Sequence, residues 1–93
     1  MLTIIAKVVA KKDSLDLVKS ELIKLVEATL KEEGCINYDL HQDLDEPHIF
    51  MFHENWSTYE LWEQHMKSPA LELYKQATEG AIEKLVLNKL NKV

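Results

Sequence analysis

The chain has 93 residues, of which 46% are hydrophobic and 29% charged, and its formal net charge at pH 7 is −5. This length and composition fit one folded domain spanning residues 1–93 and exclude a multidomain or a disordered protein. The acidic balance disfavours nucleic acid as a partner, and neither a signal peptide nor an apolar run of roughly 20 residues is found, so we expect a cytoplasmic protein that does not bind membranes.

Residues 2–10 predict a strand, and the segment after them predicts a helix. The first segment is rich in Ile and Val, and Ser14 behind it is a favourable N-cap residue. From Leu15 onward, apolar residues recur at spacings of three and four, which is the period of a helix with one buried face. Gly34 suits the position after a helix, because glycine adopts the left-handed backbone conformation at little cost. The helix is therefore expected to end near Glu33.

The middle of the chain predicts a hairpin. Residues 35–43 alternate apolar with polar side chains, which is the period of a strand. A polar turn over residues 44–47 follows, and residues 49–56 then form a second strand. Because residues 49–52 are all apolar, both faces of this strand are expected to carry apolar side chains.

The last third of the chain predicts a helix in two pieces and a final strand. Ser57 and Glu60 form a capping box, in which the Ser57 side chain is expected to accept a hydrogen bond from the backbone at the start of the helix. Ser68 and Pro69 restart the helix, since they suit the N-cap and the first helical position. Residues 82–90 close the chain as a strand.

These elements follow the βαββαβ order of an α+β, ferredoxin-like fold, which demands a four-stranded antiparallel sheet with its helices on one face. The other face would be bare, yet the first strand is expected to carry apolar side chains on both faces. A chain of this size buries a small core, so we expect a homodimer in which the bare faces of two sheets pack together, with Phe50 or Phe52 in the contact. The apolar residues of the first strand are Ile4, Ile5, Val8 and Val9.

Several short motifs together resemble the antibiotic biosynthesis monooxygenase family over essentially the whole chain. They are Gly34-Cys35, Leu40-His41-Gln42, Pro47, Glu54-x-Trp56, and His65 ahead of Ser68-Pro69. The resemblance implies a dimeric ferredoxin-like α/β barrel, with the pocket in the hollow that two copies enclose. Members of the family include cofactor-independent monooxygenases of quinols and polycyclic aromatic phenols, haem-degrading enzymes, and isomerases of a phosphorylated signalling sugar.

The resemblance implies a cofactor-independent monooxygenase that oxidises an electron-rich aromatic or quinol substrate with O₂. A phenolate or enolate of this kind can pass an electron to O₂ and then recombine with it, so no metal or other cofactor is expected. The partners would be a small hydrophobic or aromatic molecule and O₂. The protein must supply a dry, aromatic-lined pocket and a group that moves a proton, a task suited to histidine. We expect catalysis by His65 or His41, and substrate binding by Tyr38, Phe50, Phe52, His53, Glu54, Trp56, Trp62 and Tyr74.

Each candidate also has a purely structural interpretation. His65 could bond the carbonyl groups at a helix end, and His41 could face solvent. Glu54 could act as an acid or base if it is buried without a partner, or it could form a structural hydrogen bond. Core packing is the alternative for the two tryptophans, and an inert buried thiol for the single cysteine, which are Trp56, Trp62 and Cys35.

Other function classes remain as rivals. An isomerase of a small phosphorylated or hydroxyketone substrate would need basic side chains around the pocket, and Lys7 is the strand lysine best placed to supply one. A non-catalytic dimer that binds a hydrophobic molecule would need only the cavity. Haem degradation is disfavoured, because His65 and Lys75 align with a Trp and a His of the haem-degrading relatives and the first strand has no Asn. A calcium loop at residues 43–54 is disfavoured, because Pro and His occupy positions that require Asp or Asn and Gly.

Overall fold

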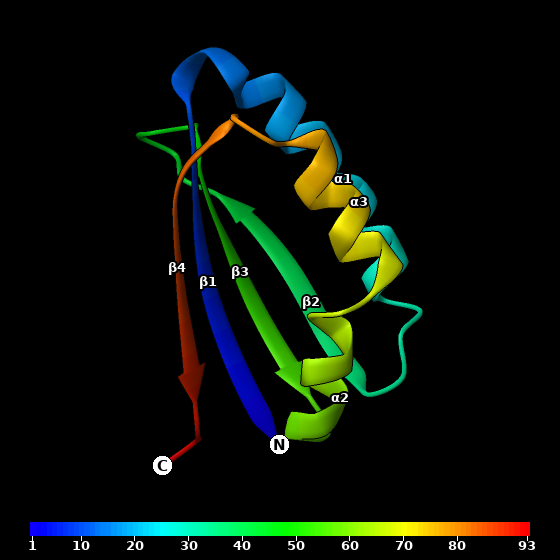
Figure 1. Ribbon diagram of the computed structural model, residues 1–93. Helices are drawn as coiled ribbons and strands as arrows, with labels where there is room; N and C mark the ends of the chain where they lie inside the picture. Colours follow the sequence, from blue (N-terminus) through cyan, green and yellow to red (C-terminus); the bar gives the residue numbers. More distant parts are fainter.

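Four strands form one antiparallel sheet, and the helices cover one of its faces, in the computed structural model, which describes residues 1–93 (Figure 1). The sheet order is β2-β3-β1-β4, with every neighbouring pair antiparallel. The expected ferredoxin-like α+β fold is therefore confirmed. The elements in chain order are β1 (Leu2–Ala10), a short 3₁₀ turn (Lys12–Ser14), α1 (Leu15–Thr29), β2 (Cys35–Gln42), β3 (Ile49–Trp56), α2 (Tyr59–His65), α3 (Pro69–Ala77) and β4 (Ile82–Leu90).

The first helix is shorter than its sequence pattern predicts. It ends at Thr29, because the amides of Lys31 and Glu32 bond to carbonyls only three residues back, as Glu32 N does to Thr29 O at 2.9 Å. The connection then ends at Gly34, whose φ is 85°. A Cβ at this glycine would lie 2.5 Å from a side-chain carbon of Leu61 on α2. Gly34 is thus required both by its backbone conformation and by the close approach of α2.

The second helix begins one residue later than the capping box predicts. Thr58, rather than Ser57, is the N-cap, and its side chain accepts a hydrogen bond from Leu61 N at 3.1 Å. The restart is as expected, because Ser68 accepts a hydrogen bond from Leu71 N at 3.2 Å and Pro69 opens α3. This break between α2 and α3 places the last residue of α2, His65, at a corner between the helices and the sheet. None of the helices is long and apolar enough to cross a membrane.

The two faces of the sheet differ in character. Every second residue of β1, from Ile4 to Ala10, is buried on the face that the helices cover. Phe50 and Phe52 also point to this inner face and are buried there, so the expectation that one of them lies on the bare face was wrong. The outer face does carry apolar side chains, but they alternate with polar ones. Its residues on β1 and β3 are Thr3, Ile5, Lys7, Val9, Ile49, Met51, His53 and Asn55.

The helices cover the inner face unevenly. The main contacts between helices and sheet join α1 to β2 and α2 to β3, while α3 packs on α1. The inner side chains of β4 are therefore only partly covered, and Leu85 is 60% exposed. This arrangement leaves room between α3 and the β1–β4 half of the sheet, which is where an apolar cavity lies.

Candidate active site

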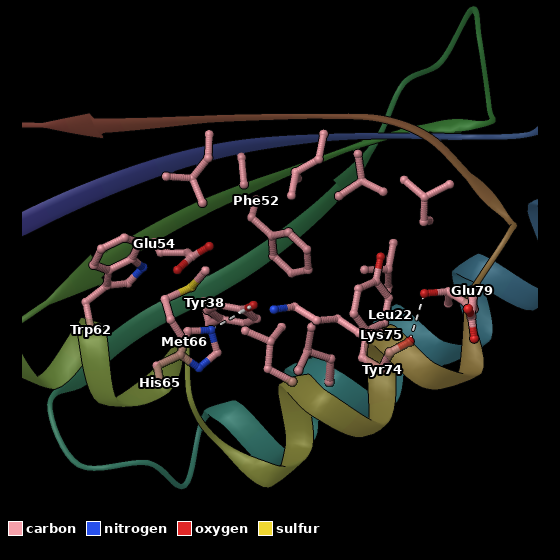
Figure 2. Close-up of a pocket in the computed structure, with 18 of the residues that line it drawn as sticks. Leu22, Tyr38, Phe52, Glu54, Trp62, His65, Met66, Tyr74, Lys75 and Glu79 are labelled. Carbon is pink, nitrogen blue, oxygen red and sulfur yellow. Dashed lines mark hydrogen bonds between the residues drawn. The ribbon is translucent and has the colours of Figure 1, made fainter.

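A cavity of about 330 Å³ lies between the inner face of the sheet and the helices (Figure 2). Thirteen of its 19 lining residues are hydrophobic. The cavity belongs to one chain and lies on the helix side of the sheet, which differs from the expected position in a hollow between two copies. Its apolar walls are formed from all four strands and all three helices, chiefly by Ala6, Val8, Leu22, Leu25, Phe52, Met66, Leu71, Ile82, Leu85 and Leu87.

Polar side chains lie at both ends of the cavity and between them, where Figure 2 shows Tyr38 and Lys75. His65, Glu54 and Trp62 lie at one end, and Glu79 lies at the other, as Figure 2 shows. Lys75, which is exposed on α3, also lines the cavity. A ligand in this space would therefore meet an imidazole and a carboxyl group at one end, with an apolar surface along most of its length.

His65 is buried, at 3% exposure, although it is a polar residue at a helix end. Its Nδ1 lies 2.9 Å from Oε1 of Glu32, and its Nε2 lies 3.4 Å from the hydroxyl oxygen of Tyr38. Because a carboxylate only accepts hydrogen bonds, this contact assigns the imidazole proton to Nδ1. Nε2 then accepts the hydrogen bond from the Tyr38 hydroxyl, and Tyr38 itself lines the cavity.

Burial lowers the pKa of His65, and the bond to Glu32 and its negative charge oppose this effect without cancelling it. The imidazole is accordingly neutral near pH 7. Its ring is also held by aromatic neighbours, with ring centroids 4.8 Å from Trp56 and 5.3 Å from Tyr38. A neutral, fixed imidazole of this kind can take up a proton from a molecule in the cavity by way of the Tyr38 hydroxyl.

Glu54 is a second buried titratable group, at 4% exposure on β3. Burial raises its pKa from 4.5 to about 7, and the hydrogen bond that it accepts from Trp56 Nε1 at 3.0 Å opposes the shift. Glu54 therefore forms the structural hydrogen bond that was one interpretation of the sequence. Its pKa is still near neutrality, as the other interpretation, an acid or base, requires. It is the cross-strand partner of Tyr38, which places both side chains on the same face of the sheet.

The structure brings six of the ten predicted site residues to the cavity, namely Tyr38, Phe52, Glu54, Trp62, His65 and Tyr74. Phe50 and Trp56 are buried in the adjoining core instead. His41 and His53 pair with outer-face residues of β3 and β1 and are exposed on the side of the sheet away from the cavity. Tyr38 and His41, both on β2, therefore lie on opposite faces of the sheet.

Sequence reasoning missed Glu32, which bonds the imidazole from the turn after α1. No local pattern marks it, since its partner lies 33 residues away. Lys7, the candidate basic residue of an isomerase, lies on the outer face, whereas Lys75 lines the cavity. Burial, together with the nearby carboxylates, raises the pKa of Cys35 to about 11, as suits an inert thiol. No group of three or more His, Cys, Asp or Glu side chains has the arrangement of a metal site.

The sequence model described as antibiotic biosynthesis monooxygenase matches residues 1–77. The chain is similar to the solved structure of PA3566 from Pseudomonas aeruginosa, with 28% identity over 99% of this chain and 93% of that chain, and a TM-score of 0.94. It is also similar to a structure described as an antibiotic biosynthesis monooxygenase, with 26% identity, 100% and 99% coverage and a TM-score of 0.94.

A third similar structure is a conserved protein from Methanosarcina mazei Go1, with 27% identity over 99% of this chain and 92% of that chain, and a TM-score of 0.90. No curated protein sequence matches this chain. The residues matched by the family model include Glu32, Tyr38, Glu54 and His65, so the whole polar end of the cavity falls within the matched region.

Proposed function

The chain belongs to the antibiotic biosynthesis monooxygenase family, and on this premise we propose that it is a cofactor-independent monooxygenase that oxidises an electron-rich aromatic or quinol substrate with O₂. The observation that carries the proposal is the neutral imidazole of His65, whose Nε2 bonds the Tyr38 hydroxyl at one end of a mostly apolar cavity. We assign His65 as the base that removes the substrate's hydroxyl proton.

Removal of this proton is the step that a protein can accelerate without a cofactor. Direct reaction of a closed-shell organic molecule with triplet O₂ is spin-forbidden, but a phenolate can give up one electron and then recombine with the superoxide formed. The substrate supplies all the electrons, one oxygen atom enters the product, and the other leaves as water with two hydrogens taken from the substrate. The base is then needed to generate the phenolate, and an acid to protonate the departing oxygen.

Glu54 is suited to the second task. A carboxyl group with a pKa of about 7 is partly protonated near neutral pH, so it can donate a proton to an oxygen atom inside the cavity. Tyr38 contributes a hydroxyl group beside Nε2 that can hold the substrate oxygen. The mostly apolar walls lower the local dielectric around these groups, which strengthens their hydrogen bonds.

The size and lining of the cavity favour this substrate class over the alternatives. Its volume of about 330 Å³ is at the lower end of the range for small-molecule sites. Among the lining residues Lys75 is the one lysine, and no arginine is present. A phosphorylated substrate of an isomerase would call for several converging cations, so an uncharged aromatic molecule suits the site better.

We further propose that the protein acts as a homodimer through the outer face of the sheet. Ile5 and Val9 are half-buried on this face, and Met51 is 39% exposed beside them. The proposal is supported by the small size of the core, since a second copy would cover these apolar side chains. The cavity of each chain would lie outside this contact, on the helix side of its own sheet.

The test is O₂ uptake with a panel of quinols and anthrones, measured on the wild-type protein and on His65→Ala. We expect uptake with some members of the panel and a loss of about 100-fold or more in the variant, as for removal of a general base. His48→Ala is the matched control, because this histidine lies in the hairpin away from the cavity, and it should retain wild-type rates. A folded wild-type protein that gives no uptake above buffer with any substrate would contradict the proposal.

A further inference from the structure

His65 forms part of the wall between two hollows of the molecule. One is the apolar cavity, and the other is a groove of about 500 Å³ on the opposite side of the imidazole. His65 is the one residue that lines both. The groove is mostly polar, and several of its residues are exposed to solvent. Its lining consists of Glu32, Glu33, Leu61, Gln64, His65, Lys67, Ser68, Pro69 and Ala70.

The two nitrogens of the imidazole face different hollows. Nε2 bonds Tyr38, which lines the cavity, and Nδ1 bonds Glu32, which lines the groove. The side chain of Glu32 is 23% exposed, whereas that of His65 is 2% exposed. An unbroken chain of hydrogen-bonding groups therefore leads from the inside of the cavity to a carboxylate in contact with solvent.

We propose that Tyr38, His65 and Glu32 form a proton relay, through which the substrate's hydroxyl proton leaves the cavity without the entry of water. This inference rests on the proposed function, since it concerns the proton removed in that reaction. Glu32 acts through His65 and does not touch the substrate, so it is a positioning and proton-exchanging residue rather than a catalytic one.

The transfer balances in both directions. Outward, the substrate proton moves to the Tyr38 oxygen, the Tyr38 proton moves to Nε2, and the proton on Nδ1 moves to Glu32, which releases it to solvent. The substrate is left as an anion, and His65 carries its proton on Nε2. When Glu54 has given its proton to the departing oxygen, the same steps run in reverse, return a proton to the cavity to replace it, and restore the proton on Nδ1. The relay thus consumes no protons over a full cycle, in agreement with an overall reaction that releases only water.

The groups around His65 suit this role. On the cavity side they are Tyr38, Glu54 and Lys75, and on the groove side they are Glu32, Glu33 and Lys67. Burial raises the pKa of Tyr38 strongly, and the charge of Glu54 adds to this effect, so Tyr38 gives up its proton only as it receives another. Glu32 supplies the nearest charge to the imidazole and favours its proton on Nδ1.

Nitrogen-15 NMR of the histidine rings tests the relay without any substrate. We expect neutral His65 in the wild-type protein to carry its proton on Nδ1. Glu32→Gln should keep this tautomer, because its amide oxygen still accepts the bond, while the pKa of His65 falls because the charge is lost. Glu32→Ala should lower the pKa and shift the proton toward Nε2. Glu33→Gln, which changes a neighbouring carboxylate of the same groove, should leave both properties unchanged.

Kinetics distinguishes proton exchange from simple positioning. If Glu32 relays protons, kcat of Glu32→Gln falls about tenfold or more while KM stays within about twofold, and Glu33→Gln is unaffected. A wild-type kcat in Glu32→Gln would overturn the relay, because the amide keeps the ring orientation but cannot take up the Nδ1 proton.

The NMR result keeps the inference separable from the proposed function. Neutral wild-type His65 with its proton on Nε2, or a pKa of His65 that is the same in Glu32→Ala as in wild type, would overturn the relay whatever substrates are oxidised. If no quinol is oxidised but the tautomer and the pKa depend on Glu32 as expected, the monooxygenase assignment fails and the hydrogen-bonded path across the wall is supported.

Discussion

Replacing Glu54 with glutamine removes an ionisable carboxyl group that is buried at the polar end of the cavity. Burial raises the pKa of this carboxyl group from 4.5 to about 7, so the folded protein holds the proton more tightly than the unfolded chain does. The resulting stabilisation is fully present below pH 4.5 and is lost as the pH rises through about 7. At about 1.4 kcal/mol for each pKa unit, the difference between the two values corresponds to about 3 kcal/mol.

Glutamine has the same shape, cannot ionise, and can still accept the hydrogen bond from Trp56 through its amide oxygen. We therefore expect Glu54→Gln to have nearly wild-type stability in mild acid and to be more stable than wild type by about 3 kcal/mol above neutrality. Urea unfolding of both proteins from about pH 5 to about pH 8 measures this difference, which should widen by about 2.5 kcal/mol over that range.

Glu83→Gln is the control, because Glu83 is exposed on β4, and its stability should follow the wild-type curve. Parallel curves for wild type and Glu54→Gln would refute the reasoning, since they would mean that the carboxyl group ionises as readily in the folded protein as in the unfolded chain.

Three further predictions concern the glycine turn, the indole and the outer face. Gly34→Ala should lower the free energy of unfolding by about 3 kcal/mol, because the backbone is strained and the added carbon clashes with α2. Gly80→Ala should lower it by only about 1 kcal/mol, because Gly80 has a similar φ of 79° but no atom within 4 Å of the added carbon. Equal losses in urea unfolding would contradict this. Trp56→Phe should raise the pKa of Glu54 further, as read from carboxyl carbon NMR shifts, because the indole hydrogen bond holds it down. Met51→Asp should give a monomer in sedimentation, and an unchanged dimer would place the contact elsewhere.

The inner face of the sheet was predictable from sequence because the strand pattern has a period of two. Tyr38 and His41 are three residues apart on β2, so they must lie on opposite faces whichever face the helices cover. The pattern cannot decide which of these two side chains points toward the cavity, because this depends on the packing of α1 and α3. His65 lines the cavity, whereas His41 and His53 do not, because they lie on the other face of the sheet.

The contact between Glu32 and His65 was not predictable, for a different reason. Local propensity placed the end of the first helix near Glu33, and a helical Glu32 would have had a different direction from the observed one in the turn. The turn is positioned by long-range contacts, since Ser57 N bonds Gly34 O at 2.8 Å and Leu61 packs where a side chain on Gly34 would lie. Tertiary packing therefore decided the position of the carboxylate that orients the imidazole.

The stability cost of Glu54 leads to a last prediction. Glutamine would fit the same space and keep the indole bond, so a charged form that lowers stability above neutrality has no structural benefit over it. We expect Glu54→Gln to be the more stable protein near pH 8 and yet to oxidise quinols at least about tenfold more slowly, because the amide cannot pass a proton to the departing oxygen. Unfolding and O₂ uptake measured on the same preparation decide the matter. A variant that gains the stability and keeps the full rate would reduce Glu54 to a partner of Trp56 and leave proton transfer to His65 alone.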